Sequence, residues 1–293
     1  MQSSSQKNYG CEPIWEATLP IFDEFVKICK KYKLRYFLTD GCALGTVRYK
    51  GFIPWDDDLD VSMPREDYER LISLPEMAFP PFLKLVTWRN CKSFPLLFAK
   101  LQDVRKDKIF EVERSVGHIL YNGLFIDIFP VDGYPETKLS KFLIKLKRLV
   151  VVPLHRYRTS RFSEQSSKGK IAWMAGAALG AILPFWRSRE SLLNYVESAL
   201  KAHPLMAGGM AGRATLKTDI LLYPPVPSES WMGEKEMEFC GRQVALPVGL
   251  DAYLRSQYGD DYMTPPPENA RHPAHVYPFR CAWWLGPDIG AVE

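Results

Sequence analysis

Hydrophobic and polar residues alternate strictly between Asp58 and Met63, early in the chain. Asp58, Asp60 and the serine that follows fall on one side, and the leucine, valine and methionine between them fall on the other. A period of two residues is typical of a half-buried strand. The pattern therefore predicts a strand that holds two carboxylates side by side on its polar face.

Periodicity also predicts the elements around this strand, and together they indicate an α/β (α+β) protein with a mixed sheet and helices packed on it. We expect Gly208, Gly209 and Gly212 in a flexible loop over the site, and the prolines of 220–227 in an irregular connection. The predicted helices are 14–32, a helix from 64, 191–202 and a proline-initiated helix after 245 with Gly259 as its C-cap; the predicted strands are 33–39, 82–88, 95–103 and 124–132, with an edge hairpin over 239–246.

The segment 124–132, LFIDIFPVD, alternates in the same way and places Asp127 in the middle of an apolar strand. A carboxylate buried there without a partner would be costly, so Asp127 needs a metal, a cation or a hydrogen-bond network. A structural aspartate that caps a neighbouring loop is the alternative. Asp132, in the turn that follows, is expected to shape that turn or to line a pocket.

Composition and charge narrow the class of protein. The chain has 293 residues, of which 46% are hydrophobic and 25% charged, with a net charge of +4, as in ordinary globular proteins. It contains no motif that reads DNA or RNA, so we expect no nucleic-acid partner. The six cysteines have no metal-ligand spacing and the N-terminus lacks the apolar core of a signal peptide, which favours a reducing cytoplasm.

Two carboxylates held as close as Asp58 and Asp60 repel each other unless one is protonated or a cation lies between them. Mg²⁺ prefers all-oxygen ligands and keeps positions open for phosphate oxygens, with Mn²⁺ as an alternative. Upstream, Gly41 follows an apolar run and begins a segment that resembles a helix N-terminus, where backbone N–H groups can bind phosphate. Arg48 and Lys50 add cationic donors. A metal-and-phosphate site is one interpretation, and a solvated strand end is the other.

The longer string around these residues is more specific than the Asp-x-Asp pair. Gly-x-x-x-Gly, then x-x-Arg, then Ile-Pro-Trp-Asp-Asp-Asp-x-Asp, within 41–60, resembles the signature of the LicD family, which includes the fukutin-related transferases. The resemblance extends over about residues 20–132 and, less closely, 238–280. It implies a nucleotidyltransferase-like fold and the transfer of a phosphate-linked group, such as phosphocholine or ribitol phosphate, from a CDP carrier to a sugar hydroxyl.

The resemblance also assigns expected roles to residues. It makes Asp127 the third carboxylate of a catalytic and metal-binding set with Asp58 and Asp60, either as a metal ligand or as the base that activates the acceptor hydroxyl. The expected substrate-binding residues are Gly41, Arg48, Lys50, Asp57, Lys100 in the string AKLQD, Asp132, Arg271 and His272. For Lys100, a surface lysine is the alternative. Trp55 is expected in the core, with stacking on a base or a choline cation as the alternative.

The expected function is therefore a metal-dependent transferase that releases CMP. Its donor is CDP-linked, and its acceptor is a hydroxyl of a cell-surface glycan (lipopolysaccharide, teichoic acid or capsule) or of a lipid-linked oligosaccharide precursor. Phosphocholine is preferred by its frequency in the family, and ribitol, glycerol and sugar phosphates remain open. Two further hypotheses are a nucleotidyltransferase that uses an NTP and releases pyrophosphate, and a non-catalytic scaffold in polysaccharide assembly.

Residues 138–205 differ in character from the rest of the chain. No acid occurs between Glu136 and Glu164, and the apolar run IAWMAGAALGAILPFW follows at 171–186. The run is shorter than the ~20 residues of a membrane span, so either a buried helix or an interfacial segment fits it. We expect a catalytic core over 1–137, a helical insertion over 138–205 and a C-terminal part over 206–293 that completes the core. The expected location is cytoplasmic, with peripheral contact at the inner face of the membrane as an extension of the interfacial interpretation.

Overall fold

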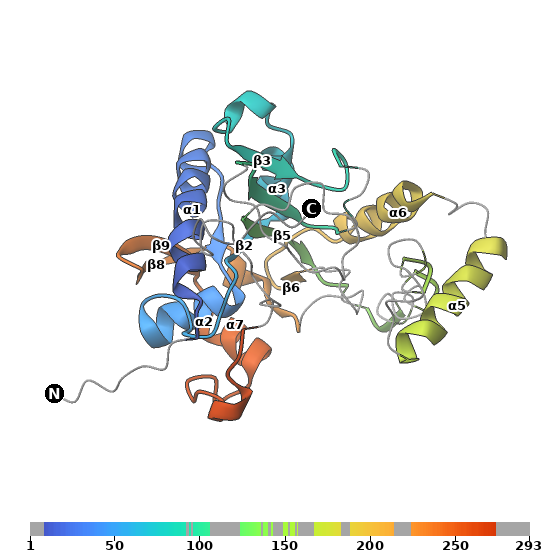
Figure 1. Ribbon diagram of the computed structural model, residues 1–293. Helices are drawn as coiled ribbons and strands as arrows, with labels where there is room; N and C mark the ends of the chain where they lie inside the picture. The colour runs from blue at the N-terminus through green and yellow to red at the C-terminus, as the bar shows by residue number, and fades with distance from the viewer. Residues whose placement is uncertain are drawn as a thin grey trace, which may run out of the picture.

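The computed structural model describes residues 9–91, 94, 96–105, 124–135, 137–139, 142, 149–151, 153–155, 157, 167–182, 188–213 and 224–273. Helices and strands follow one another in mixed order (Figure 1). The helices are α1 (Glu12–Tyr32), α2 (Asp40–Tyr49), α3 (Arg65–Ile72), α5 (Ser167–Ile182), α6 (Arg189–Lys201) and α7 (Leu250–Tyr258), with short 3-10 helices η1 (Glu76–Ala78), η6 (Ser228–Trp231) and η7 (Glu268–Ala270). The strands are β1 (Phe37–Leu38), β2 (Asp60–Pro64), β3 (Leu83–Val86), β4 (Ala99–Asp103), β5 (Phe125–Gly133), β6 (Met210–Arg213), β7 (Val226–Pro227), β8 (Glu234–Phe239) and β9 (Arg242–Pro247).

The main sheet is mixed and has β5 at its centre. Its order is β1-β2-β5-β4-β3, and β6 extends it from the C-terminal part of β5, with β7 beside β6. β2 and β5 are parallel, with Asp60 opposite Asp127, whereas the other pairs are antiparallel. This sheet, with helices packed on it, confirms the predicted α+β class.

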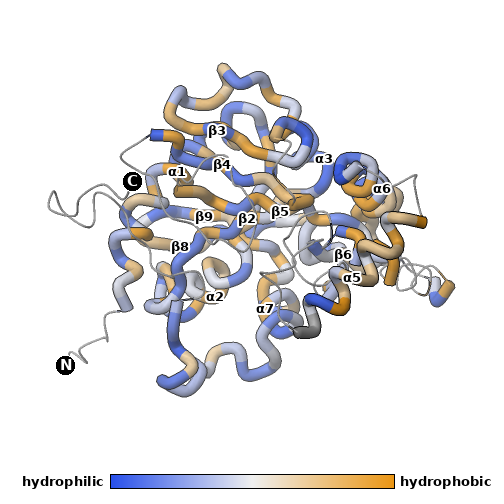
Figure 2. The backbone as a smooth tube through the Cα atoms, turned by 45° about the vertical axis from the view of Figure 1, so that its right-hand side comes forward, coloured by the Kyte–Doolittle hydropathy of each residue, from blue (hydrophilic) through white to orange (hydrophobic). Residues whose placement is uncertain are grey.

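The main core lies under the apolar face of β2 and β5. Leu59, Val61, Ile126 and Ile128 are fully buried and belong to one cluster with the apolar stripe of α1. α1 ends as Lys33 takes a left-handed conformation (φ 54°). Hydrophobic residues accordingly run along the central strands in Figure 2.

β2 departs from the half-buried strand that its alternation predicts. All five of its residues are buried, including the polar Ser62, whose hydroxyl lies 3.0 Å from the Thr39 hydroxyl. The polar face is covered because α2 packs on β2, and α7 in turn packs on α2. The prediction of side-chain direction is confirmed, and the prediction of exposure on the polar face is wrong.

The predicted loop around Gly208, Gly209 and Gly212 is correct in part, because Gly208 and Gly209 lie in a turn but Gly212 does not. Residues 210–213 form β6, in which Gly212 lies opposite Asp132 of β5. Glycine weakens the pattern of a strand, and this strand is stabilised by its pairing with β5, which no local pattern reveals. Of the predicted irregular connection over 220–227, residues 220–223 lie outside the described residues, and the last two form β7.

The predicted edge hairpin exists but begins earlier, at Glu234. The start of β8 was missed because its sequence, EKEMEF, is mostly charged and largely solvent-exposed, so it lacks the hydrophobic pattern that predicts a strand. Its two-residue turn places Cys240 and Gly241 at positive φ (49° and 73°), as a type I′ turn requires. The predicted C-terminal helix is confirmed as α7, which ends at Gly259 with φ 88°.

The segment around α5 and α6 joins the sheet through a second apolar cluster. Leu192, Leu193 and Val196 of α6 pack there with Phe98 and with Phe129 of β5. An ion network adds to this contact, in which Arg65 of α3 binds Asp132 and Glu197, and Glu69 binds Arg89 and Lys201. The division of the chain into three parts stays a prediction, but α6 is anchored to the strand that carries Asp127.

The described residues also bear on the predictions about the cysteines and about a membrane span. Four cysteines (11, 29, 42 and 240) form no disulfide in the described part of the chain, Cys91 is buried, and Cys281 lies outside the described residues. Burial raises the pKa of the Cys11 thiol to about 12 and that of Cys42 well above its usual range, so both are inert structural thiols. None of the described helices is both long enough and apolar enough to cross a bilayer.

Candidate active site

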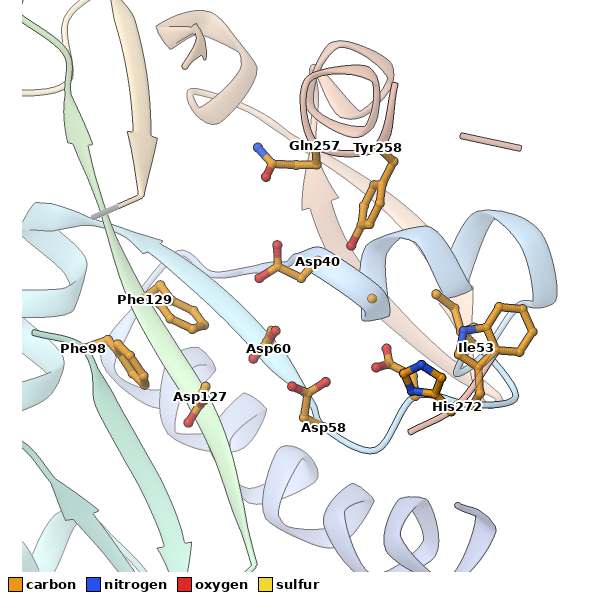
Figure 3. A pocket seen from close by; sticks show the side chains of 13 residues that line it. Asp40, Ile53, Asp58, Asp60, Phe98, Asp127, Phe129, Gln257, Tyr258 and His272 are labelled. Carbon is orange, nitrogen blue, oxygen red and sulfur yellow. The ribbon is translucent and has the colours of Figure 1, made fainter. Parts of the chain in front are cut away.

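A pocket of about 430 Å³ lies over the polar side of β2 and β5, between the start of α2 and the end of α7 (Figure 3). Acids, aromatic residues and one histidine line it. The lining residues are Asp40, Gly41, Ile53, Trp55, Asp56, Asp58, Asp60, Phe98, Asp127, Phe129, Gln257, Tyr258 and His272.

Asp60 and Asp127 meet in this pocket because of strand register. They are direct partners in the parallel β2–β5 pair, so their side chains leave the sheet on the same face. Lys100 lies opposite Asp127 on β4, and its Nζ is 2.5 Å from Asp127 Oδ1. Lys100 is 5% exposed and its ammonium lies 3.3 Å from the centre of the Phe125 ring. Asp60, Asp127 and Lys100, which the sequence analysis selected, thus lie side by side on three adjacent strands.

Asp58 precedes β2 and belongs to a second, tighter group of acids. Carboxylate oxygens of Asp56, Asp57 and Asp58 lie within 4.8 Å of one another. Trp15 of α1 fixes this turn by donating its indole N–H to the Asp56 carbonyl at 2.7 Å. The predicted trio of Asp58, Asp60 and Asp127 lines one pocket (Figure 3), but within the described chain the closest three-acid group is the consecutive one.

Gly41 is required by this packing. A Cβ added to Gly41 would lie 1.7 Å from Asp56 Oδ2, so any side chain here would displace that carboxylate. Asp56, which was not among the predicted site residues, therefore lines the pocket against the α2 backbone. Asp57, which was among them, is 4% exposed and is not a lining residue.

Two acids of the pocket each have a buried carboxylate oxygen that lacks a hydrogen-bond partner among the described residues. Asp60 Oδ1 and Asp56 Oδ2 are buried and make no hydrogen bond in the described structure. Burial raises the pKa of Asp60 well above its usual range, Asp58, Asp40 and Asp127 raise it further, and Arg213 opposes them. Burial, and then Asp58 and Asp57, likewise raise the pKa of Asp56. Such carboxyls either hold protons or await a cation.

These residues fit a divalent cation. Unpaired carboxylate oxygens facing a pocket are the hard donors that Mg²⁺ and Mn²⁺ prefer, and the pocket leaves room for further oxygen ligands. Asp58 and Asp60, with Asp56 or Asp127, could hold such an ion. The assignment of metal ligands remains a prediction.

Asp40 is held by residues that sequence reasoning missed. Arg213 of β6 pairs with both of its carboxylate oxygens, and the Tyr253 hydroxyl, 3.0 Å from Oδ1, accepts from the Asp40 backbone N–H at 3.1 Å. The Arg213 side chain is fully buried and its guanidinium carbon lies 4.6 Å from the centre of the Phe129 ring. Arg213 sits in the glycine-rich segment expected as a loop, so its own neighbourhood contains no signal for this role.

The ends of the pocket are aromatic. Phe98 and Phe129 lie together, with ring centres 4.4 Å apart, and the Tyr258 hydroxyl points into the same space (Figure 3). Trp55 is partly buried and packs against the main core, as expected, and it also lines the pocket. Its stacking on a base or a choline cation stays a prediction. Burial, with the charge of Asp40 next, raises the pKa of the Tyr258 hydroxyl, which keeps it a neutral donor.

Besides Asp57, Lys100 and Arg271, three predicted binding residues are absent from the pocket lining: Arg48, Lys50 and Asp132. Arg48 donates to the carbonyls of Tyr262 and Thr264, and thereby ties α2 to the segment after α7. Lys50 is exposed and lies 3.6 Å from Glu238 of β8. Asp132 is buried in a two-bond pair with Arg65, at 2.7 and 2.6 Å.

The two predicted binding residues near the C-terminus, Arg271 and His272, lie in different environments. His272 lines the pocket, whereas Arg271 donates to the Pro266 carbonyl at 2.8 Å and covers the Trp55 ring at 5.2 Å. Arg271 therefore supports the pocket wall from behind.

A mixed sheet with acids on adjacent strands and a helix N-terminus over them defines an α+β protein of the nucleotidyltransferase-like kind. Comparisons with known proteins give the family. Residues 33–158 match the model described as "LicD/FKTN/FKRP, nucleotidyltransferase domain". The chain is 29% identical over 260 residues to "Lipopolysaccharide cholinephosphotransferase LicD" of Haemophilus influenzae, covering 88% of this chain and 93% of that protein.

Two further relatives match over shorter stretches. An uncharacterized protein of Rickettsia typhi is 42% identical over 115 residues, 39% of this chain and 33% of its own length. One of Rickettsia prowazekii is 26% identical over 113 residues, 38% of this chain and 37% of its own. The family-model match and the similarity over most of the chain support membership of the LicD family and a phosphotransferase activity, as the motif in 41–60 predicts.

Proposed function

We propose that this protein transfers phosphocholine from a CDP-linked donor to a hydroxyl of a cell-surface glycan or its lipid-linked precursor, and releases CMP. The choice of transferred group and acceptor rests on its similarity to the lipopolysaccharide cholinephosphotransferase of Haemophilus influenzae. The observation that carries the chemistry is the buried Asp60, with an oxygen that lacks a hydrogen bond, in direct register with Asp127 at the pocket.

In this proposal Asp58 and Asp60 hold a divalent cation, with Asp127 beside them. Mg²⁺ or Mn²⁺ would neutralise phosphate charge, which is the main requirement of phosphoryl transfer. The start of α2, with Gly41 in its first turn, offers backbone N–H groups toward the same space. Gln257, Tyr258 and His272 are side-chain donors among the lining residues.

Asp127 is the proposed proton acceptor for the sugar hydroxyl. The hydroxyl oxygen forms a bond to the distal phosphorus of the donor, and the bond from that phosphorus to the bridging oxygen breaks, so that CMP leaves with the electron pair. Lys100 orients Asp127 through the 2.5 Å contact to Oδ1, which leaves Oδ2 to face the acceptor. Arg48 contributes indirectly, by holding residues 262–264 against α2.

The aromatic end of the pocket supports choline over uncharged groups. A quaternary ammonium is attracted to the faces of aromatic rings, most strongly where water is excluded. Phe98, Phe129, Trp55 and Tyr258 all line the pocket that contains the acids. Ribitol and glycerol phosphates would need hydroxyl partners instead, and the acids are the main group available for that.

Product analysis tests the proposal. The full chain is incubated with CDP-choline, CDP-ribitol, CDP-glycerol or CTP, with Mg²⁺ or with a chelator, and nucleotide products are separated. Metal-dependent release of CMP from CDP-choline, with the larger thermal shift for that donor, is the expected result. Release of pyrophosphate from CTP would instead indicate a nucleotidyltransferase, and preference for another conjugate would replace phosphocholine. Binding and turnover with none of them would favour a scaffold.

A further inference from the structure

The helix α5 is apolar on all sides, yet only part of it is buried. On one face, Gly176 lies so close to the preceding segment that a Cβ would come within 2.0 Å of the Pro153 carbonyl. Beside it, the Trp173 ring packs edge-to-face on Tyr157, with centres 4.9 Å apart. This is how α5 is attached to the rest of the protein.

The other face of α5 is open. Ile171, Met174 and Ile182 are 66%, 50% and 73% exposed, and Ala175 and Ala178 between them are exposed as well. Their spacing of three and four residues places them in one stripe, about 16 Å long at the rise of an α-helix. A helix that is apolar all round normally lies inside a protein or in a membrane, so the stripe requires a covering partner.

Exposed hydrophobic side chains also occur among the described residues before α5. Leu139, Phe142 and Leu149 are 67%, 61% and 70% exposed. Residues 137–182 thus supply six of the thirteen exposed large hydrophobic side chains in the described chain, whereas monomeric proteins rarely gather such residues in one region. α5 lies at the edge of the molecule opposite α1 (Figure 1), clear of the main sheet.

Charge decides between the partners that could cover the stripe. The sequence from 137 to 163 contains eight Lys and Arg residues and no acid. A second copy of this chain would carry the same excess of positive charge and would be repelled. An anionic lipid surface attracts the same charges, by about five-fold in binding for each basic residue that reaches it.

We propose that the exposed stripe of α5 docks this protein on the surface of an anionic lipid bilayer. With 16 residues, α5 is too short to span the hydrocarbon core, so it lies in the plane of the interface with its stripe among the acyl chains. This inference does not depend on which group is transferred. It does give the transferase a way to reach a lipid-linked acceptor, because α6, next in the chain, packs against Phe129 at the pocket.

Vesicle co-sedimentation of the full chain tests the proposal without any donor or acceptor. The protein is mixed with phosphatidylcholine vesicles or with vesicles that contain phosphatidylglycerol. We expect binding at least about ten-fold tighter to the anionic vesicles, with most of the difference lost in about 0.5 M salt. Absence of binding, or equal binding to both kinds of vesicle, would overturn the proposal.

Two variants separate the stripe from apolar surface in general. The triple variant Ile171→Ser, Met174→Ser, Ile182→Ser should lose about ten-fold or more in vesicle binding, while its thermal unfolding stays unchanged because the replaced side chains are exposed. Met77→Ser removes a methionine that is 90% exposed and far from α5 in sequence, and should bind vesicles like the parent chain.

Light scattering tests the remaining alternative, in which the stripe is an interface between two copies of the chain. If the parent chain were a dimer that the triple variant converts to a monomer, with no loss of vesicle binding, the stripe would be an interface between copies and the lipid proposal would be wrong. Release of CMP without vesicles should be the same in the parent and the variant, so a failure of the transfer chemistry is seen separately.

Discussion

Arg213 on β6 donates to both carboxylate oxygens of Asp40, the first residue of α2, across 173 positions of sequence. Asp40 has a left-handed backbone (φ 49°), a conformation that residues with a side chain rarely adopt. The ion pair and the Tyr253 hydroxyl hold it there, and Gly41 and Asp56 follow in the same corner of the pocket. β6 therefore determines where the N-terminus of α2 lies over the acids.

Arg213→Lys should lower both stability and turnover. A lysine keeps the charge but cannot bind two oxygens at once, so we expect a loss of about 1–3 kcal/mol in the free energy of unfolding. Because Asp40 would no longer be fixed, kcat/KM should fall about 10- to 100-fold even where the variant is fully folded. Denaturant unfolding and steady-state kinetics measure the two effects.

Arg242→Lys is the matched control. Arg242 also binds one aspartate, Asp23, through two hydrogen bonds, but at the surface, so its loss should stay within about 1 kcal/mol and leave turnover unchanged. Equal behaviour of the two variants would mean that Asp40 does not need its partner.

Gly41→Ala should impair donor binding and leave the fold intact. The new methyl group would occupy the position of Asp56 Oδ2, so this carboxylate must move. We expect an increase of about ten-fold or more in the KM for the donor, measured with CMP release. Gly233→Ala, where a Cβ would lie 3.4 Å from Val248, should behave like the parent chain.

Asp60→Asn should abolish turnover, by at least about 100-fold, because the pocket loses a charge meant for a cation. The variant should fold well, since neutralising Asp60 removes repulsion from Asp58, Asp40 and Asp127. Asp58→Asn should act in the same direction. Asp261→Asn changes an exposed aspartate after α7 and should have no effect on rate. Near-normal turnover of Asp60→Asn would remove this residue from the proposed cation site.

Mg²⁺ should stabilise the protein more at high pH than at low pH. The raised pKa of Asp60 means that the metal-free native state binds an extra proton, so its stability falls as pH rises through that pKa. A cation must displace this proton, so its binding strengthens over the same range. Thermal unfolding with Mg²⁺ and with a chelator, from about pH 5.5 to 8, measures the difference. A metal effect that does not change with pH would contradict it.

Glu69 should make the protein sensitive to acid. Burial alone would raise the pKa of Glu69, but hydrogen bonds from Arg89 and Lys201 outweigh it and lower the pKa from 4.5 to about 2. Because the folded pKa is depressed, the stabilisation is present above about pH 4.5 and is lost as pH falls toward 2.

Glu69→Gln should therefore cost about 1–2 kcal/mol at pH 7, after allowance for solvent screening, and almost nothing near pH 2. Glu66→Gln, an exposed acid 4.0 Å from Arg35, should change stability by less than about 0.5 kcal/mol at either pH. Denaturant unfolding across this range compares them, and a constant difference for Glu69→Gln would show that its ion pairs do not titrate as described.

Local hydrophobic patterns were sufficient to predict most of the strands and helices that carry the acids. The alternation around Asp60 and Asp127 predicts their side-chain directions, because period two fixes which residues share a face. It cannot predict that Asp60 and Asp127 are direct partners, since register depends on how β2 and β5 align across the chain. It also cannot predict that the polar face of β2 is covered. That cover depends on α2, which packs on β2, and on α7, which packs on α2 from a distant part of the sequence.

Residues of the site that were missed share one property. Arg213 and Tyr253 act on Asp40 from distant segments, and their own neighbours form a glycine-rich strand and an ordinary helix. Conversely, Arg48 and Lys50 lie near the motif in sequence, but their side chains bind the segment after α7 and β8. Proximity in sequence gives the position of a backbone, not the direction of a long side chain.

In topological terms, residues 134–209 are the connection of a β-hairpin. The chain leaves the sheet at Gly133 and returns directly opposite it at Ala211, so the two ends of this long excursion are fixed to each other. Lengthening such a connection costs little free energy, since the closure entropy grows only with the logarithm of its length. Insertions or deletions within this connection should therefore leave the register of Asp60 and Asp127 unchanged.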